Sequence, residues 1–173
     1  MELNKLFEIN KSFIYGFILA VILCLIIFNL LNTNCYVTPI FSPNSEDEII
    51  SLINNAQKSI DIEMYVFTSA NIQNALINAR NRGVEVRVIL EQEIETNEDS
   101  FYKLISNGIE TKWAPRKFSR THSKFMIIDN KLIFVGSTNF SNSALTSNRE
   151  AAVLTSCSVS NFIDIFEQDW KDA

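Results

Sequence analysis

Hydrophobic and polar positions follow three different patterns along the chain. Residues 12–31 form an apolar run without a charge, the pattern of a helix that is apolar on every side. Residues 32–43 begin with polar positions and contain Pro39 and Pro43, which disfavour helix. Beyond them, short alternating segments are separated by segments with helical spacing. The pattern predicts an apolar helix, a linker over 32–43 and one folded domain over 44–173.

The apolar run Ser12–Leu31 has the length of a membrane-spanning helix. At 1.5 Å per residue it would reach about 30 Å, the thickness of a bilayer core. A buried helix would show polar positions at helical spacing, and a signal peptide would have a shorter apolar stretch and a cleavage site of small residues. We expect a retained transmembrane anchor within 1–31, after a cytoplasmic stub; the other two explanations stay open.

The charges that flank the run predict its orientation. Lys5 and Lys11 precede it, and no Lys or Arg follows until Lys58. Because positively charged flanks favour the cytoplasmic side, we expect a single-pass protein with its domain on the non-cytoplasmic side. An organelle outer membrane with the domain facing the cytosol is the alternative.

In the domain, strands and helices alternate at first and strands follow one another later. The first helix opens with a capping-box pattern, Ser45-Glu-Asp-Glu48. Further helices are expected over 70–82, 97–107 and 158–171, and strands over 60–66, 84–90, 109–113, 124–128, 132–135 and 151–155. This order predicts an α/β domain with a mixed β-sheet flanked by helices.

Composition narrows the range of functions. Hydrophobic residues make up 47% of the 173, enough for a full core, and the net charge of −5 argues against a protein that coats nucleic acid. The three cysteines have no C-x-x-C spacing, and one histidine cannot complete a usual zinc site. We expect no metal site and no cofactor. The cysteines are interpreted as structural or incidental, and a Cys35–Cys157 disulfide stays open.

The single histidine, His122, begins a run of the form H-x-K-x4-D that ends at Asp129. In an extended chain, residues two apart face the same side, so His122 and Lys124 would form a pocket for a phosphate. Asp129 lies at a predicted turn, where aspartate often bonds nearby backbone amides. Taken alone, the pair also fits a polar loop with a solvated lysine.

Two later segments add polar groups suited to phosphate. Gly136 permits close backbone approach, and Ser137 and Asn139 can donate hydrogen bonds without adding charge. Glu150 could accept a hydrogen bond from an imidazole and fix its tautomer. Each segment also has a plain structural explanation, a common turn for the first and an ion pair with Arg149 for Glu150.

Together, and in this order, these motifs resemble the phospholipase D superfamily. The resemblance extends over 41–171 and includes Phe41-Ser-Pro43, Tyr65-Val-Phe-Thr-Ser69 and Arg82-Gly-Val-Glu-Val-Arg-Val88. It is strongest to short, single-motif, nuclease-like members, including bacterial endonucleases and the mitochondrial cardiolipin hydrolase group. That last group usually carries a cysteine/histidine zinc-binding insertion, which this sequence lacks.

The resemblance implies a phosphodiesterase that requires no metal. His122 would attack phosphorus and form a phosphohistidine, while Lys124 and Asn139 hold the phosphate oxygens. Ser137 would assist, and Glu150 would orient His122. A second histidine must protonate the leaving oxygen. Since the chain has only one, we expect a homodimer whose partner supplies it.

The sequence leaves the substrate open. A stretch before His122 could follow a nucleic-acid backbone, bind anionic lipid headgroups or be a solvated loop. It contains Arg116, Lys117 and Arg120, interleaved with Trp113 and Phe118. An acidic stretch, expected away from the cleft, contains Glu91, Glu93, Glu95, Glu98 and Asp99. We expect an endonuclease acting on DNA or RNA. The alternatives are a phospholipase, cardiolipin hydrolase or phosphatidyl transferase acting on its membrane, and a catalytically silent binding protein.

Overall fold

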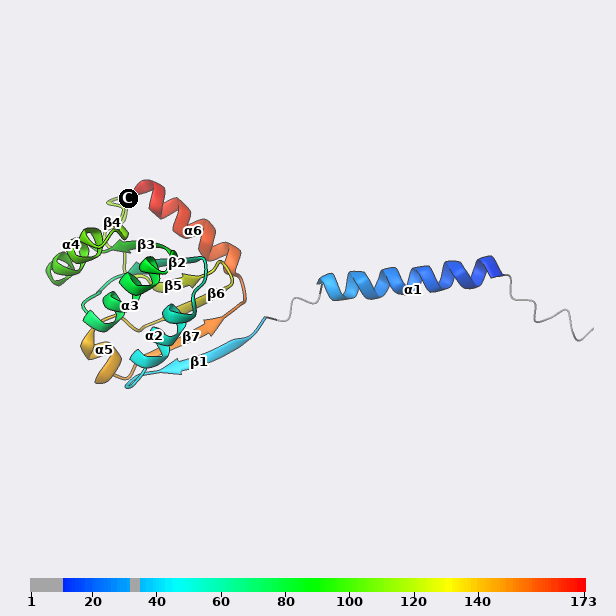
Figure 1. The fold of residues 1–173 in the computed structure, drawn as a ribbon, viewed down its shortest axis with the longest axis horizontal. Coiled ribbons are helices and arrows are strands. Elements are labelled where there is room, and N and C mark those ends of the chain that lie inside the picture. The colour runs from blue at the N-terminus through cyan, green and yellow to red at the C-terminus, as the bar shows by residue number, and fades with distance from the viewer. Residues whose placement is uncertain (1–10, 32–34) are drawn as a thin grey trace, which may run out of the picture. The chain divides into compact units, whose positions relative to one another are not determined.

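The computed structural model describes residues 11–31 and 35–173 of the chain (Figure 1). Residues 1–10, which belong to the predicted stub, and residues 32–34, the start of the predicted linker, lie outside the described residues. Chain contacts divide the molecule into two compact units, and the division falls between Cys35 and Tyr36. Each unit is described by itself below.

The described part of the first unit is dominated by helix α1 (Lys11–Leu31). A membrane crossing needs about 20 consecutive apolar residues in one helix. The side chains that the structure describes in α1 run from Ser12 to Ile27, and no helix among the described residues is long and apolar enough to cross a membrane. This finding contradicts the predicted transmembrane anchor over Ser12–Leu31 and the single-pass, non-cytoplasmic placement derived from it.

The second unit is a seven-stranded mixed sheet with helices on both faces (Figure 1). Its elements are β1 (Val37–Phe41), α2 (Glu46–Asn55), β2 (Ser59–Met64), α3 (Ala70–Asn81), β3 (Glu85–Leu90), the 3-10 helix η2 (Glu95–Asn97), α4 (Glu98–Ser106), β4 (Glu110–Trp113), β5 (Lys124–Ile128), β6 (Leu132–Gly136), α5 (Asn142–Thr146), β7 (Ala151–Thr155) and α6 (Val159–Asp172). The strand order is β1-β7-β6-β5-β2-β3-β4, with β2, β3 and β4 parallel and the other pairs antiparallel. The predicted mixed sheet flanked by helices is confirmed.

Two elements and one cap differ from the prediction. Strand β1 occupies part of the predicted linker, and Pro39 is tolerated there because β1 lies at the edge of the sheet. Helix α5 has only five residues, too few to show a helical period. Ser45 is the N-cap of α2, but its buried hydroxyl has no hydrogen-bond partner among the described residues, so the expected capping box is not formed.

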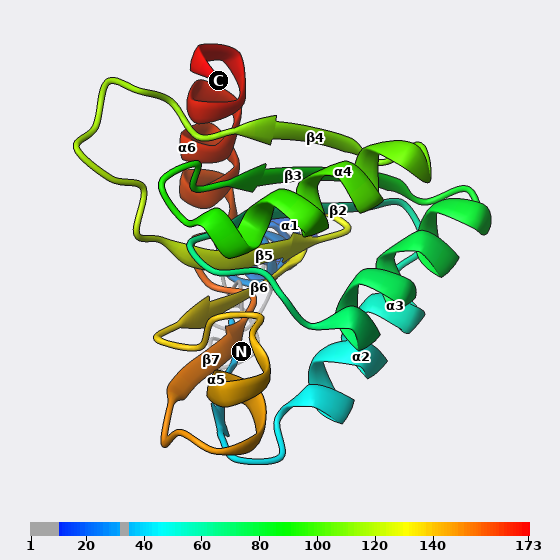
Figure 2. The same ribbon diagram turned by 90° about the vertical axis from the view of Figure 1, so that its left-hand side faces the viewer.

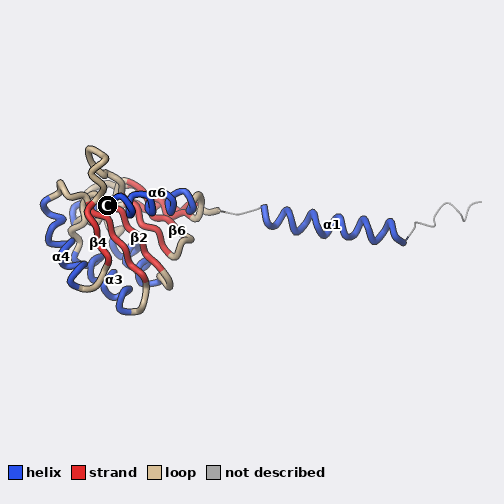
Figure 3. Tube along the Cα trace, turned by 90° about the horizontal axis from the view of Figure 1, so that it is seen from above, coloured by secondary structure: helices blue, strands red, loops and turns tan. Residues whose placement is uncertain are grey.

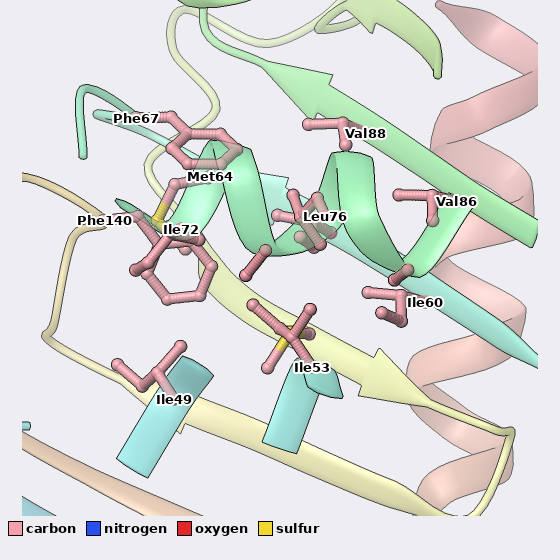
Figure 4. Close-up of a cluster of buried hydrophobic side chains, with 14 of the residues drawn as sticks. Ile49, Ile53, Ile60, Met64, Phe67, Ile72, Leu76, Val86, Val88 and Phe140 are labelled. Carbon is pink, nitrogen blue, oxygen red and sulfur yellow. The ribbon is translucent and has the colours of Figure 1, made fainter. Parts of the chain in front are cut away.

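Apolar cores lie on both faces of the sheet. Helices α2, α3 and α4 cover one face and α6 covers the other (Figures 2 and 3). The larger core includes Ile53, Leu76 and Phe140 (Figure 4), and the smaller core lies under α6. Strand β5 contributes to both, with Met126 in one core and Phe125 in the other. Because β5 is buried on both sides, the residues that precede it are held at the rim of a rigid sheet.

Candidate active site

The predicted chemical groups meet at one edge of the sheet, the edge formed by the ends of its central strands and not by an outer strand. Strand β5 begins at Lys124, β6 ends at Gly136 and β7 begins at Ala151. Because neighbouring strands in this part of the sheet are antiparallel, these three strand ends lie at the same edge. The loops attached there carry His122, Ser137, Asn139 and Glu150.

His122 and Lys124 lie at the centre of this edge. The Lys124 side chain is buried, and its Nζ donates to the His122 carbonyl oxygen at 2.6 Å and lies 3.2 Å from His122 Nδ1. Partial burial, then the charges of Lys124 and Arg120, lower the pKa of His122. Burial also lowers the pKa of Lys124, while the charge of Glu150 acts in the opposite direction. The site therefore favours a neutral imidazole beside an ammonium group.

Tyr65 packs against this imidazole, although no role was predicted for it. The two ring centroids are 4.1 Å apart, and Lys124 Nζ lies 4.9 Å from the centroid of the tyrosine ring. The Tyr65 backbone N–H donates to the Ser123 carbonyl oxygen at 3.1 Å. Tyr65 opens the Y-V-F-T-S segment, so the family-like motif was the signal that could have identified it. The ring shields one side of His122 from water.

Asn139 retains a free hydrogen-bond donor. Its Oδ1 accepts a bond from the Val66 backbone N–H at 3.2 Å, and its Nδ2 has no partner among the described residues. The next residue, Phe140, is fully buried, and its carbonyl oxygen accepts bonds from the backbone N–H groups of Thr68 and Ser69. These contacts fix the amide and leave one of its ends available to a ligand.

The carboxylate of Glu150 is held by short polar side chains. Ser137 Oγ donates to it at 2.6 Å, and Asn148 Nδ2 donates to it at 3.2 Å. The Glu150 backbone N–H donates to Ser42 Oγ at 2.8 Å, which ties the end of β1 to the site. The described contacts include no hydrogen bond between Glu150 and His122, so Glu150 acts on the pair through its charge near Lys124.

Gly136 is required where β6 meets β7. A Cβ atom at this position would lie 2.3 Å from the Ala151 carbonyl oxygen and 2.4 Å from Ala152 Cα. Both atoms belong to the backbone, so neither can move aside without displacing β7. The missing side chain therefore allows the close approach that brings Ser137 to Glu150.

Asp129, the last residue of the H-x-K-x4-D run, lies at the opposite end of β5. It has a positive φ of 53° in the turn to β6. Its carboxylate accepts hydrogen bonds from the backbone N–H groups of Gln57, Lys58 and Ser59 at 2.6–3.1 Å. Burial opposes them, but these bonds lower the pKa of Asp129. Asp129 thus fastens the turn to the start of β2.

The basic stretch is largely engaged with other groups. Lys117 Nζ lies 3.3 Å from Asp169 and 2.5 Å from Asp172 of α6, and Trp113 is stacked on Phe101 with centroids 3.9 Å apart. One face of the Trp113 ring is therefore covered by Phe101. The exposed residues that remain are Arg116, Phe118 and Arg120. Of these, Arg120 is close enough for its charge to act on His122.

The acidic stretch is not wholly remote from the site, contrary to expectation. The parallel strands β2 and β3 end at the same edge, so the residues after β3 reach the loop before His122. Glu91 accepts a hydrogen bond from the Thr121 backbone N–H at 2.6 Å, and Glu93 lies 3.4 Å from Arg120. The first two acidic residues therefore support the loop that precedes His122.

A cavity of about 390 Å³ opens beside His122, between the sheet and α6. Its walls are mainly apolar, and Ile165 of α6 is 56% exposed there. The lining comprises His122, Ser123, Lys124, Phe125, Val135, Gly136, Asn161, Phe162 and Ile165. An apolar hollow bordered by a few polar groups is the usual form of a binding site.

Neither a metal cluster nor a free cysteine lies at this edge among the described residues. No group of three or more His, Cys, Asp or Glu side chains in the described ranges could hold a metal ion. Cys35 and Cys157 are disulfide-bonded, and Cys24 is free. The polar chemistry of the described site consists of imidazole, ammonium, amide, hydroxyl and carboxylate groups.

Comparison with known proteins identifies the family. Residues 49–170 match the family described as "Cardiolipin synthase, PLD-like domain". The chain belongs to the phospholipase D superfamily. The crystal structure of a phospholipase D family member, Nuc from Salmonella typhimurium, superimposes with a TM-score of 0.73 and 28% identity, covering 80% of this chain and 96% of Nuc.

Two curated members of the phospholipase D superfamily are similar in sequence. The mitochondrial cardiolipin hydrolase of Chlamydomonas reinhardtii is 26% identical over 132 residues, covering 75% of this chain and 59% of the relative. The phospholipase D of Rickettsia prowazekii is 36% identical over 111 residues, covering 61% of this chain and 52% of the relative. The chain thus spans a little over half the length of these relatives.

Proposed function

We propose that the chain is a phosphodiesterase in which His122 is the nucleophile. The observation that carries the proposal is the imidazole of His122, favoured in its neutral form, 3.2 Å from the ammonium of Lys124. A neutral imidazole can attack phosphorus, and an adjacent cation stabilises the charge that accumulates on the phosphate oxygens. Asn139 Nδ2 adds a neutral donor to the same edge of the sheet.

The proposed reaction has two displacements. In the first, His122 attacks phosphorus, the bond to the leaving oxygen breaks, and a second histidine donates a proton to that oxygen. In the second, the same histidine removes a proton from water, the water oxygen attacks phosphorus, and the phosphorus–nitrogen bond breaks. In this proposal Lys124 turns from His122 Nδ1 to the phosphate. Glu150 then accepts a hydrogen bond from the Nδ1–H group and orients the ring.

The second histidine comes from a second copy of the chain in this proposal. One chain contains a single histidine, so the site is chemically incomplete alone. The apolar cavity borders His122 itself, and its exposed wall residue Ile165 would be covered by a partner. A two-fold contact at this cavity would bring the two copies of His122 together.

A polynucleotide is the first candidate substrate. Arg116 and Arg120 are exposed, together with Phe118, on the stretch that leads to His122, and the charge of Arg120 acts on the imidazole. Such residues can contact a phosphate backbone and a base. The similarity to Nuc over nearly the whole of that chain supports a short, single-site member of the superfamily.

A phospholipid is the second candidate substrate. In the basic stretch, for which a polynucleotide was one of three possible partners, Lys117 contacts acidic residues and Trp113 is stacked on Phe101. The curated relatives are named for a cardiolipin hydrolase and a phospholipase D. The headgroup phosphate of a lipid could meet the same imidazole and ammonium.

The proposed function is tested with the full chain in EDTA, beside His122→Asn. Single-stranded DNA, RNA and vesicles of cardiolipin or phosphatidylcholine are offered in parallel. We expect cleavage of one substrate class and a loss of about 10⁴–10⁶-fold in His122→Asn, because removing a nucleophile from a coupled site has an effect of that size. Mass spectrometry should detect an adduct on His122 in the intact chain during turnover, with a mass equal to the phosphate plus the part of the substrate that stays bonded to it.

The matched control is Asp164→Asn, because Asp164 is an exposed carboxylate on the outer side of α6. It should retain full activity. Cleavage of nucleic acid alone would establish the first candidate, and release of phosphatidic acid alone would establish the second. Equal activity of His122→Asn and the natural chain would remove His122 from the mechanism.

A further inference from the structure

Glu63 is a buried carboxyl group directly behind the loop that carries His122. It lies on β2, on the sheet face covered by α6, and is 2% exposed. Ser123 Oγ donates a hydrogen bond to Glu63 Oε1, and Ser123 separates His122 from Lys124 in the chain. The other oxygen, Oε2, is buried without a hydrogen-bond donor among the described residues. A buried polar atom of this kind calls for a further partner.

Asp169 of α6 lies beside this carboxyl group. Its side chain is buried, and its charge raises the pKa of Glu63. Two carboxylates accept hydrogen bonds and cannot donate, so a hydrogen bond between them requires a proton on one of them. A proton on Glu63 Oε2 makes that oxygen a donor to Asp169 and leaves Oε1 as the acceptor for Ser123. Both oxygens of Glu63 are then satisfied.

The charges around this pair set the pH range of the shared proton. Burial raises the pKa of Glu63 to about 7; the hydrogen bond from Ser123 opposes this rise, and the charge of Asp169 adds to it. Lys117, on the loop before β5, also opposes the rise and holds the α6 side of the pair through Asp169 and Asp172. The proton is therefore held in mildly acidic solution and lost to solvent above neutrality.

We propose that Glu63 is a positioning residue that keeps the His122 loop in place only while it shares a proton with Asp169. The inference rests on the proposed role of His122 as nucleophile. Loss of the proton leaves two buried like charges in contact, which repel each other and release Ser123. The Ser123 carbonyl oxygen also accepts a bond from Tyr65, which packs on the imidazole, so displacement of Ser123 reaches His122 along two paths.

The test compares the pH dependence of kcat/KM in the natural chain and in Glu63→Gln. A glutamine oxygen accepts from Ser123 and its amide donates to Asp169 at every pH. As the pH rises, the natural chain should lose activity with the loss of two protons: one from the histidine that acts as acid, whose pKa lies below 6.5, and one from Glu63, whose pKa is about 7. Glu63→Gln should lose activity with one proton only, and should match the natural chain in mildly acidic solution.

The control is Asp172→Asn, a carboxylate on the same helix that binds Lys117 but does not contact Glu63. In Asp172→Asn, kcat/KM should still fall with the loss of two protons as the pH rises, as it does in the natural chain. If kcat/KM of Glu63→Gln also fell with the loss of two protons, the positioning role would be overturned. A uniform loss of activity at all pH values in Glu63→Gln would also overturn it, because a merely structural residue behaves in that way.

A second readout does not depend on cleavage. A raised carboxyl pKa contributes stability that is fully present below pH 4.5 and is lost as pH rises through about 7. Between these values the unfolding constant of the natural full chain should rise about tenfold per pH unit relative to Glu63→Gln. An equal pH dependence in the two chains would overturn the shared proton. If the difference appears and no phosphodiester is cleaved, the proton pair stands and the proposed function fails.

Discussion

At the scale of single residues, the central feature is the contact between one imidazole and one ammonium group. Partial burial and the charge of Lys124 make the protonated form of His122 less favourable, and burial lowers the pKa of Lys124. His122 consequently stays neutral to a lower pH than a solvated histidine does. The arrangement suits a nucleophile that must not carry a proton when phosphate arrives.

The pKa of His122 can be measured directly, because the chain contains one histidine and so gives one imidazole signal in an NMR titration. We expect a pKa below the ordinary 6.5. Replacing Lys124 by methionine should raise it toward that value, since the repelling charge is removed while the apolar stem is kept. The neutral fraction near pH 6 should therefore fall in Lys124→Met.

Lys131→Met provides the control, because Lys131 lies in the turn at the far end of β5 and is not among the charges that act on His122. The His122 signal should titrate there as in the natural chain. A pKa of 6.5 or above in the natural chain would contradict the electrostatic description of the site.

The identity of the central residues was readable from the sequence, but many of their partners were not. His122 and Lys124 are two positions apart, so extended geometry is enough to put them together. Lys117, by contrast, is paired with Asp169 and Asp172, more than fifty positions away. Glu63 had one local signal, since it occupies an alternate position of a strand whose neighbours Ile62 and Met64 are fully buried.

At the scale of elements, the site depends on how closely β6 and β7 approach. Gly136→Ala would place a methyl group against the backbone of Ala151 and Ala152. We expect a loss of about 1–3 kcal/mol in the free energy of unfolding, the usual effect of overpacking. Denaturant titration of the full chain measures it, and activity per folded molecule should fall as well because Ser137 and Glu150 are displaced.

Gly83→Ala is the control that separates an effect on the active site from a general loss of stability. Gly83 has a φ of 92° and open space around its Cα, so alanine there is strained without a clash. That variant should lose stability and keep full activity when folded. If Gly136→Ala were as stable and as active as the natural chain, the close approach of β6 and β7 would not matter to the site.

The order of elements followed from periodicity, and the exceptions have physical causes. Strands β5 and β7 were predicted with the bounds that the structure shows, because they are short runs of apolar residues between turn signals. Strand β1 was taken for a linker, because Pro39 within it argues against a strand unless that strand lies at a sheet edge. Edge position is a property of the assembled sheet and cannot be read from five residues.

At the scale of the whole molecule, the proposed reaction requires two copies of the chain. Mixing equal amounts of the natural chain and His122→Asn, under conditions that exchange subunits, distinguishes a shared site from two independent ones. A shared site leaves only the dimers with two intact histidines active, about a quarter of the total. Independent sites would leave about half, and that result would contradict the shared site.

The proposed contact surface can be tested separately with Ile165→Asp, which places a charge at the mouth of the apolar cavity. We expect the variant to sediment as a monomer and to lose activity while its circular dichroism is unchanged. Asp164→Asn, one position earlier on α6, should remain dimeric. A dimeric and active Ile165→Asp would place the contact elsewhere.

The position of Asp129 gives the H-x-K-x4-D spacing a geometric meaning. The motif spans the length of strand β5. His122 lies just before the strand, Asp129 lies just after it, and the strand between them is buried. With Asp129 held in its turn, adding or removing one residue inside that strand would shift its register and move His122 and Lys124 together out of line with the loops that carry Asn139 and Glu150. The number of residues between Lys124 and Asp129 is thus set by the length of β5, while their identity is set by packing in the two cores.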